Sequence, residues 1–338
     1  MSNRDWYFDN AKCVLILLVL LGHFLRPYID KELVVHSLYV WIFFFHMPAF
    51  IFISGYFAKG FRRHGYFKKI SKKLLLPYVV FQLLYSIYYT FLYDKSQWNI
   101  DIFTPQWSLW FLLSLFSWNV LLKIFVRIPK QLSLILALLL GVGAGMVEAE
   151  KWLSLSRTFT FFPFFLLGFY LKRRHIEILF SWPVRLFSLI CLASMFILIY
   201  FYFPDLPQEW LYGSKSYTTL GVHEEIGAVG RLVIYGISTL MAFSFMALIP
   251  NRRLPISKFG TRTFYIYILH GFILKYLHST SFPTFIMDTN GYPLLLFISL
   301  GVMLLLGSKP IIHVVRPLVE WRLPRQEQRS SSQQSSST

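Results

Sequence analysis

The chain has 338 residues, of which 56% are hydrophobic, 19% are aromatic and only 14% are charged. A soluble domain of this size could not keep so much apolar area off its surface, so the composition argues against a soluble protein. The formal net charge of +17 would suit a nucleic-acid-binding protein, unless the positions of the charges have another explanation. Cys13 and Cys191 are the only cysteines, and this excludes a disulfide framework and a thiolate metal cluster, so we expect no metal.

Apolar segments of the length needed to cross a membrane, about 17 to 25 residues, occur roughly ten times along the chain. We therefore predict an all-α, polytopic membrane helix bundle with about ten transmembrane helices. The expected spans are residues 12–29, 35–58, 74–93, 106–126, 131–146, 158–171, 185–203, 229–249, 263–280 and 293–315. No small-residue cleavage site follows the first span, so we expect it to remain as a membrane anchor rather than to act as a signal peptide.

Charges of opposite sign alternate along the connections between these spans. Basic residues dominate 59–73, 172–185, 252–262 and 316–329, whereas acidic residues dominate 30–32, 94–101, 148–150, 205–225 and 288. This alternation is the positive-inside bias, and with an even number of spans it places both termini in the cytoplasm of a multi-pass cell-membrane protein. Membrane topology therefore explains the net charge without a nucleic-acid partner.

The connections are too short to hold a second soluble domain. The longest of them, Phe203 to Ala228, has about 25 residues. We therefore expect one membrane domain over residues 1–320. Residues 321–338 are polar and of low complexity, and we expect them to form a disordered cytoplasmic tail because they cannot bury enough apolar area to offset the entropy of ordering.

Two ionisable residues lie on one face of the first expected span. Lys12 and His23 are eleven positions apart, which at 100° per residue is three turns plus about 20°. The axial rise between them is about 16 Å, which places Lys12 at the cytoplasmic boundary and His23 past the bilayer centre. Asp9 lies three residues before Lys12 and can pair with it, either within a site or as an interfacial anchor.

Two further histidines, His46 in the second expected span and His270 in the ninth, lie at depths comparable to that of His23. Histidines at this depth are expensive to expose to lipid, so we expect each to face the bundle interior or a wet cavity. His46 or His270 alone could equally be a structural hydrogen-bond partner between helices. For His23 a functional role is favoured, because Lys12 shares its helical face.

Other polar residues are weaker candidates for a site. Ser54 does not form a G-x-S-x-G nucleophile elbow, and we interpret it as a small residue for helix packing. Some cations of the basic run before the third span must face the mouth of the bundle, where a polyanionic donor could bind. Arg157 stands at the expected outer face, and it either anchors a lipid headgroup or holds a sugar or phosphate group.

Several motifs resemble those of one family. A basic residue, ten residues and then histidine occur in "FDNAKCVLILLVLLGH", followed by "FHMPAFIFISGYF" and by a basic loop leading into "LLLPY". Later in the chain come "WSLWFLLSL", "SLSRTFTFFPFFLLGFY" and "FGTRTFYIYILH". In this order, from Arg4 to about His270, the chain resembles the acyltransferase 3 family of integral-membrane acyltransferases, most closely the branch related to fucose 4-O-acetylase.

The resemblance implies ten helices, an acyl-CoA donor on the cytoplasmic side and an acceptor hydroxyl on a cell-envelope or exported saccharide. It also implies that His23 is the essential histidine and Lys12 its basic partner. Many relatives carry Arg at the position of Lys12, so the contact of Lys12 with a phosphate is expected to be that of a point charge rather than a bidentate grip.

We therefore expect an enzyme, an O-acetyltransferase that transfers groups other than aminoacyl groups, with acetyl-CoA as donor substrate and no cofactor. His23 would act as general base on the acceptor hydroxyl, or would itself be acetylated transiently. The donor phosphates would be held at the cytoplasmic mouth by Lys12, Lys69, Lys72 and Lys73, with Asp9 beside them. Acceptor orientation is assigned to Arg157, His46 and His270.

A second interpretation is a transporter or flippase of lipid-linked or nascent saccharide, in which the histidines relay protons. Paired broken helices and internal symmetry, which would favour transport, are not evident in the sequence. A structural or sensory membrane protein would not need an aligned lysine and histidine.

Overall fold

The computed structural model describes residues 5–94, 101–148 and 152–320. Within these residues every regular element is a helix, which confirms the predicted all-α class. The expected tail, residues 321–338, lies outside the described residues.

Ten longer helices form the framework of the molecule: α1 (Trp6–Leu25), α2 (Leu33–Phe57), α3 (Tyr66–Leu92), α4 (Trp110–Phe125), α5 (Lys130–Gly143), α6 (Leu155–Tyr170), α8 (Trp182–Tyr202), α10 (Glu224–Leu248), α12 (Thr263–His278) and α14 (Leu294–Leu306). Shorter helices lie between and after them: α7 (Arg173–Ile178), α9 (Glu209–Tyr212), α11 (Ser257–Gly260), α13 (Phe282–Asp288) and α15 (Lys309–Val319). Five single 3-10 turns complete the described elements: η1 (Arg26–Tyr28), η2 (Ala58–Gly60), η3 (Trp107–Leu109), η4 (Ala144–Met146) and η5 (Trp152–Ser154).

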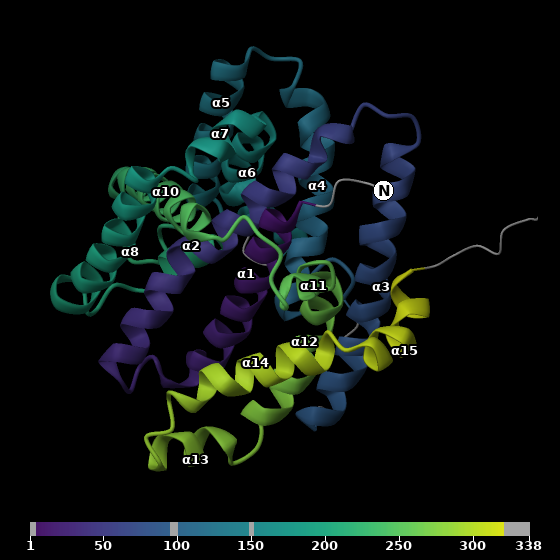
Figure 1. Ribbon diagram of the computed structural model, residues 1–338, viewed down its shortest axis with the longest axis vertical. Helices are drawn as coiled ribbons and strands as arrows, with labels where there is room; N and C mark the ends of the chain where they lie inside the picture. Colours follow the sequence, from purple (N-terminus) through teal and green to yellow (C-terminus); the bar gives the residue numbers. More distant parts are fainter. Residues whose placement is uncertain (1–4, 95–100, 149–151, 321–338) are drawn as a thin grey trace, which may run out of the picture.

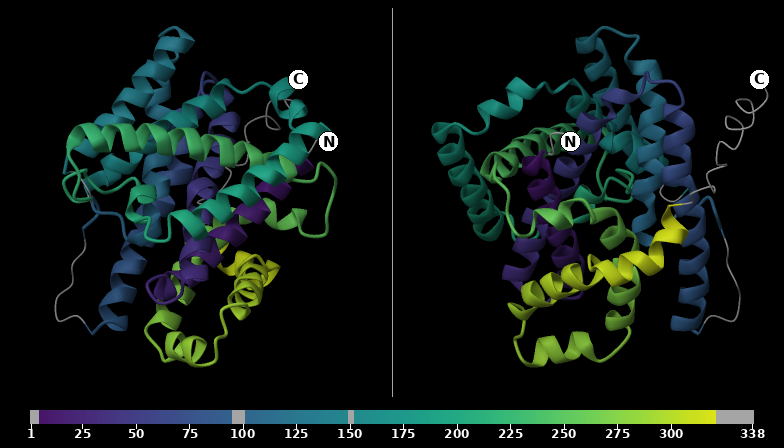
Figure 2. Two further views of the ribbon diagram at one scale, coloured as in Figure 1. Left: turned by 90° about the vertical axis from the view of Figure 1, so that its left-hand side faces the viewer. Right: turned by 45° about the vertical axis from the view of Figure 1, so that its right-hand side comes forward.

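Helices α1 and α2 run through the middle of the molecule (Figures 1 and 2). Helix α1 packs against α2, α11, α12 and α14, and most of its residues are buried. Helices α8 and α10 pack together at one edge, whereas α3 lies at the opposite edge beside α15 (Figure 1). The residues of α1 are therefore surrounded by protein along most of the helix, as polar side chains inside a membrane require.

Helices α2 and α6 touch at their backbones because each contributes a glycine to the crossing. A Cβ atom added at Gly55 would lie 2.0 Å from the carbonyl oxygen of Phe165, and one added at Gly168 would lie 2.2 Å from that of Phe52. Small residues permit this close approach between membrane helices. The crossing holds α2 and α6 together, and both helices contribute side chains to the cavity described below.

The edge helix α8 presents large apolar side chains to the outside. Phe187 is 58% exposed, Ile190 is 55% exposed and Phe201 is 68% exposed. An apolar face of this kind would be unfavourable in water, whereas lipid chains solvate it without cost. The exposed face therefore agrees with a membrane-embedded chain.

Seven helical segments of the described residues are long and apolar enough to cross a membrane, and the pair α14 and α15, bent by 63°, could add an eighth. The other two expected spans fall on residues Lys130–Met146, which are apolar but short, and on α12, which has 16 residues. Each expected span is largely helical, but the expected number of ten is not confirmed, because these segments are shorter than the hydrocarbon requires for a straight crossing.

The basic connections meet at the end of the bundle where α1 begins. Lys59 donates a hydrogen bond to the carbonyl oxygen of Leu171, Arg173 forms an ion pair with Asp5, and the guanidinium of Arg253 lies over the ring of Trp6. Three stretches that are distant in sequence therefore share one end, as the positive-inside bias predicts for cytoplasmic loops. We call it the basic end.

Candidate active site

A cavity of about 390 Å³ runs along one face of α1. Its wall contains Lys12, Ile16, Val19, His23 and Arg26. These positions recur every three or four residues, which is the spacing of a single helical face. Lys12 and His23, predicted to share a face, thus open into the same cavity.

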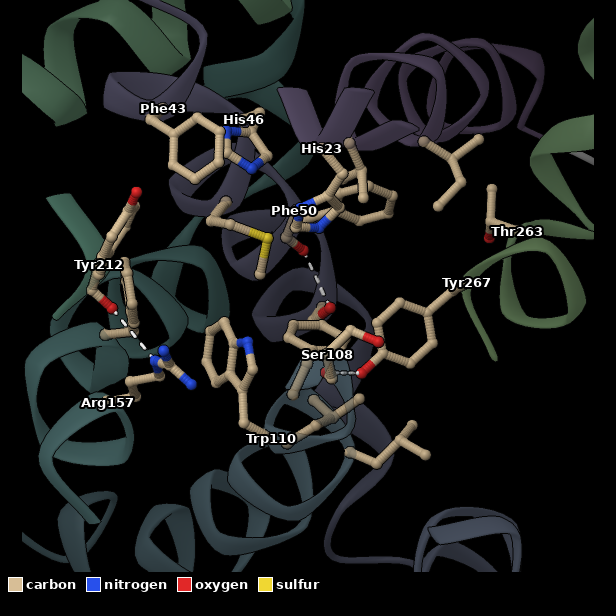
Figure 3. Close-up of a pocket in the computed structure, with 18 of the residues that line it drawn as sticks. His23, Phe43, His46, Phe50, Ser108, Trp110, Arg157, Tyr212, Thr263 and Tyr267 are labelled. Carbon is tan, nitrogen blue, oxygen red and sulfur yellow. Dashed lines mark hydrogen bonds between the residues drawn. The ribbon is translucent and has the colours of Figure 1, made fainter. Parts of the chain in front are cut away.

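Other helices close the cavity with mostly aromatic side chains (Figure 3). The residues with polar groups or large rings on these walls are Tyr39, Phe43, His46, Phe50 and Ser54 from α2, Trp107, Ser108, Trp110 and Phe111 from η3 and α4, Arg157 and Phe161 from α6, Tyr212 from α9, and Thr263, Phe264 and Tyr267 from the start of α12. Predominantly apolar walls with a few convergent polar groups are typical of small-molecule sites.

His23 points into the middle of this cavity (Figure 3). The ring of Trp107 lies 4.5 Å from the imidazole, and the ring of His270 lies 5.5 Å from it, both measured between ring centroids. Aromatic packing on one side leaves the other side of the imidazole open to the cavity. His23 is therefore accessible to a molecule that fills the space.

His46 also lines the cavity, on α2, and lies near His23 in Figure 3. Its Nδ1 atom is 2.8 Å from the carbonyl oxygen of Ile42, one turn earlier in the helix. A carbonyl can only accept, so Nδ1 carries the proton and Nε2 carries a lone pair. His46 can thus accept a hydrogen bond from a ligand hydroxyl.

His270 is fully buried, and it packs behind His23 instead of lining the cavity. Its Nδ1 atom bonds to the carbonyl oxygen of Tyr267, and its Nε2 atom has no hydrogen-bond partner among the described residues. The ring of Trp107 contacts the rings of both His23 and His270. The structure thus brings His270 to His23, although away from the cavity surface.

Lys12 marks the basic end of the cavity. Its ammonium lies 2.9 Å from a carboxylate oxygen of Asp9, and the two side chains are 24% and 8% exposed. Asp9 is itself not part of the cavity wall. The predicted pair therefore forms, and it holds the ammonium beside the cavity.

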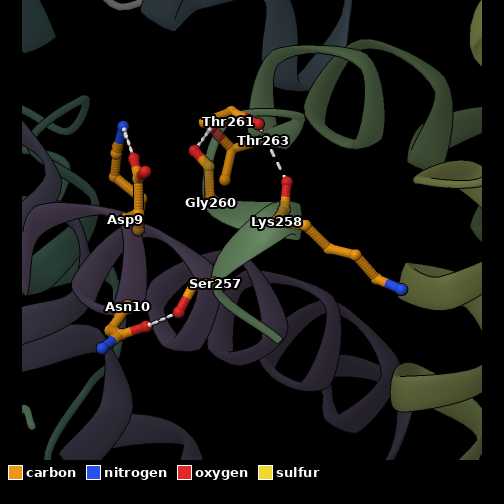
Figure 4. A network of polar contacts seen from close by, with 8 residues as sticks. Asp9, Asn10, Ser257, Lys258, Gly260, Thr261 and Thr263 are labelled. Atoms are coloured by element: carbon orange, nitrogen blue, oxygen red, sulfur yellow. Dashed lines mark hydrogen bonds and ion pairs between the residues drawn. The ribbon is translucent and has the colours of Figure 1, made fainter. Parts of the chain in front are cut away.

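A polar network fixes the start of α1 against α11 (Figure 4). The hydroxyl of Ser257 donates to Oδ1 of Asn10 over 2.5 Å, while Nδ2 of Asn10 donates to the carbonyl oxygens of Pro250 and Arg252. A Cβ atom at Gly260 would lie only 1.9 Å from the carbonyl oxygen of Asp9, so only glycine fits this contact. The network thereby anchors the turn of α1 that carries Asp9 and Lys12.

Three lysines of the expected donor site, Lys69, Lys72 and Lys73, lie on α3 and do not line the cavity. Lys72 and Lys73 are exposed, and Lys73 is close enough to interact electrostatically with Lys12 and Lys69. These side chains therefore add positive charge near the basic end without entering the cavity.

The opposite end of the cavity carries two arginines. Nε of Arg157 donates to the carbonyl oxygen of Tyr212 over 3.3 Å, and its guanidinium lies 5.1 Å from the centre of the Trp110 ring. Arg26 also lines this end of the cavity, and the hydroxyl of Tyr212 lies 2.9 Å from that of Tyr39. We call Arg26, Arg157 and Tyr212 the arginine end.

Several residues that line the cavity were not among the site residues predicted from the sequence. Arg26 follows His23 by three positions, so the periodicity that paired Lys12 with His23 also indicates Arg26. Tyr212 comes from the long connection after α8, and no sequence pattern indicates where such a connection folds back.

Among the described residues, no group of three His, Cys, Asp or Glu side chains is arranged to hold a metal ion.

Two curated relatives match part of the chain, and both are named Nodulation protein NolL. The protein of Sinorhizobium fredii (strain NBRC 101917 / NGR234) is 29% identical over 189 residues, which is 50% of this chain and 49% of the relative. That of Mesorhizobium japonicum (strain LMG 29417 / CECT 9101 / MAFF 303099) is 27% identical over 181 residues, or 50% and 48%. The chain thus spans about half the length of these relatives. No solved structure matches it significantly.

The acyltransferase 3 profile, described as an acyltransferase domain, matches residues 5–308. This range contains every residue of the cavity wall, from Lys12 to Tyr267. Because the match covers most of the chain, the protein belongs to the acyltransferase 3 family.

Proposed function

We propose that the protein is an O-acetyltransferase that moves an acetyl group from acetyl-CoA to a hydroxyl of a cell-envelope or exported saccharide. The observation that carries the proposal is the single cavity that joins Lys12, at the basic end, to the arginine end, with His23 between them. A donor and an acceptor can enter such a cavity from its two ends and meet at one imidazole.

The donor is assigned to the basic end because its phosphates need cations. Lys12 contacts them directly, while Lys69, Lys72 and Lys73 raise the local positive potential. The thioester then has to reach His23, about 16 Å further along the helix axis. The long pantetheine arm of coenzyme A suits this distance, and the mostly apolar walls suit the arm.

The reaction begins when a nitrogen of His23 takes the proton of the acceptor hydroxyl. The oxygen attacks the thioester carbonyl, a C–O bond forms, and the C–S bond breaks. The thiolate of coenzyme A leaves and takes up the proton from the imidazolium, so atoms and charges balance. In the variant route, His23 carries the acetyl group between donor and acceptor.

On the acceptor side, His46 and Arg157 supply the polar contacts. Nε2 of His46 can accept a hydrogen bond from a sugar hydroxyl, and the guanidinium of Arg157 can donate to sugar oxygens or to an anionic substituent. The rings of Trp110 and Phe43 offer flat apolar surfaces to the C–H faces of a sugar.

The test is acetyl transfer from labelled acetyl-CoA by the purified protein in detergent, with membrane insertion and abundance of each variant measured in parallel. We expect His23→Ala to reduce transfer at least about 100-fold, the contribution typical of a general base. His64→Ala is the matched control, because His64 is exposed in the loop before α3 and lies outside the cavity.

Full transfer by His23→Ala would refute the proposal. A transporter would behave differently, since it would move saccharide across sealed vesicles without acetyl-CoA and would show no transfer in detergent. Release of acetate without transfer to any saccharide would instead indicate a different acceptor.

A further inference from the structure

We infer that the acceptor carries a negative charge, as a phosphate or carboxylate group, and that Arg26 and Arg157 bind this group at the arginine end of the cavity. The inference rests on the proposed function and deepens it, because it names the chemical class of the acceptor. Phosphate and carboxylate share one chemistry here, namely anionic oxygens that accept from a guanidinium.

Both guanidinium groups line one cavity. Arg157 donates a hydrogen bond to the backbone carbonyl oxygen of Tyr212, and Arg26 lines the wall from the end of α1. Arg26 and Arg157 come from η1 and α6, so this arrangement is a property of the folded cavity and not of one helix. Tyr39 supports the arrangement through the contact between its hydroxyl and that of Tyr212.

None of the described residues that line the cavity is acidic, although Asp30 and Glu209 lie near its arginine end. The charged residues among the described lining are Lys12, Arg26 and Arg157, and none of the lining residues is Asp or Glu. Asp30 lies 3.9 Å from Arg26, but the two side chains are 74% and 44% exposed, so the pair is weak. A wall with cations and no carboxylate raises the local concentration of anions.

Membrane topology does not account for these arginines. The basic loops gather at the other end of the bundle, where Lys12 lies, and the positive-inside bias disfavours cations at the arginine end. Arginine also fits a planar or tetrahedral oxyanion in a bidentate manner.

The spacing along α1 fixes where the charge sits on the acceptor. Arg26 follows His23 by three residues, a rise of about 4.5 Å. The guanidinium of Arg26 extends toward Asp30, away from His23, so the charged group lies on the far side of Arg26 from the reacting hydroxyl.

The experiment measures binding of two probes that differ by one charged group, N-acetylglucosamine and N-acetylglucosamine 1-phosphate, to the full-length protein in detergent by calorimetry. A second pair, methyl glucoside and methyl glucuronoside, replaces phosphate by carboxylate. In at least one pair, we expect the charged probe to bind about tenfold or more tightly than its neutral counterpart. Arg26→Gln and Arg157→Gln should each reduce this preference to about threefold or less.

Lys31→Gln is the matched control, because Lys31 is exposed, lies five residues after Arg26 and does not line the cavity. Equal affinity for charged and neutral probes in both pairs would overturn the inference, whether or not acetyl transfer is observed. Competition of the charged sugar by free coenzyme A at the same arginines would also overturn it, since the arginines would then hold the donor. Loss of acetyl transfer with the charge preference intact would refute the proposed function alone.

A separate observation, the unpartnered nitrogen of His270, supports a second inference. We propose that His270 is a positioning residue whose Nε2 accepts a hydrogen bond from the N–H of His23 that faces away from the acceptor. The bond of Nδ1 to the carbonyl of Tyr267 fixes the proton on Nδ1, so Nε2 is a pure acceptor.

A buried acceptor without a partner is unfavourable, and two rings with N–H groups lie near this one, Trp107 at 4.9 Å and His23 at 5.5 Å between centroids. Trp107 packs on both rings and restricts their movement. A small rotation of His23 during catalysis brings its N–H to Nε2, and such bonds often tighten only when substrate is bound. The tautomer of His23 is then set with its lone pair toward the cavity.

Two conservative variants distinguish the roles of the two ring nitrogens of His270. Asparagine can replace Nδ1 and keep the bond to Tyr267, whereas glutamine can replace Nε2 and keep the acceptor near His23. We expect His270→Asn to lower kcat about 10-fold to 100-fold with little change in KM, and His270→Gln to stay within about fivefold of the wild type.

The reverse order, an active His270→Asn and an impaired His270→Gln, would show that only the bond to Tyr267 matters and would overturn the inference. Thermal unfolding in detergent identifies any variant that fails to fold. In a His23→Ala background the His270→Asn change should have no further effect on residual transfer, because His270 acts through His23. An additive loss would contradict this.

Discussion

Lys12 and His23 line one cavity from one face of α1, and Lys12 lies at the basic end while His23 lies deep between the helices. The separation of about 16 Å assigns different parts of one donor to the two residues. In the proposed function, the nucleotide part of acetyl-CoA stays with Lys12, and only the acyl end reaches His23.

Replacement of Lys12 should therefore affect recognition of the donor nucleotide. We expect Lys12→Ala to raise KM for acetyl-CoA about 10-fold, the loss expected for one charge-assisted contact. Lys12→Arg should remain within about threefold, because it keeps the cation. Steady-state kinetics with acetyl-pantetheine, which lacks the nucleotide, provide the control, since Lys12→Ala should not change KM for that donor. An equal effect on both donors would contradict the assignment.

His46 should contribute to acceptor binding through its free Nε2. We expect His46→Phe to raise KM for the acceptor about 3-fold to 10-fold while KM for acetyl-CoA changes little, because one neutral hydrogen bond is lost. The measurement is a set of transfer rates at varied concentrations of each substrate. A larger change in KM for acetyl-CoA would place His46 on the donor side.

The network between α1 and α11 should stabilise the fold and align Lys12. Asn10→Ala removes the partners of the Ser257 hydroxyl and of the carbonyl oxygens of Pro250 and Arg252. We expect the free energy of unfolding to fall by about 2 kcal/mol, because buried polar groups are left unpaired. Ser257→Ala in the same chain should add less than its effect alone, since the two residues share one network. Unfolding of the variants in detergent tests this, and full additivity would argue against a shared network.

The crossing of α2 and α6 should tolerate no side chain at Gly55. We expect Gly55→Ala to lower Tm, with a cost of about 1–3 kcal/mol from overpacking, because the new Cβ would lie 2.0 Å from the carbonyl oxygen of Phe165. Gly236→Ala in α10 is the control, because a Cβ there meets no atom within 4 Å. An unchanged Tm for Gly55→Ala would mean that the two helices can separate freely.

The face of α1 could be predicted from the sequence because a regular helix turns by a constant angle. The spacing of Lys12 and His23 therefore gave their common direction, and it would have given that of Arg26 as well. Arg26 lies inside the first expected span, residues 12–29, directly before Pro27, which restricts the conformation of the residue that precedes it. The structure continues α1 into η1 and keeps Arg26 on the same face.

Contacts between distant segments could not be predicted in the same way. Tyr212 reaches the cavity through the path of a long connection, and the sequence places no restriction on that path that can be read by eye. The lysines of α3 follow a helical spacing, yet the packing of α3 at the edge of the molecule leaves Lys72 and Lys73 outside the cavity. The bend of 63° between α14 and α15 also interrupts a segment that the hydropathy indicated as one continuous span.

The length and charge of the cavity wall also affect whether ions can leak across the membrane. From Lys12 to Arg26 it extends about 21 Å along α1, a large part of the roughly 30 Å hydrocarbon depth. A water-filled passage of that length could short-circuit the membrane potential. Cations stand at both of its ends and no described lining residue is Asp or Glu, so the wall disfavours the passage of protons and sodium ions.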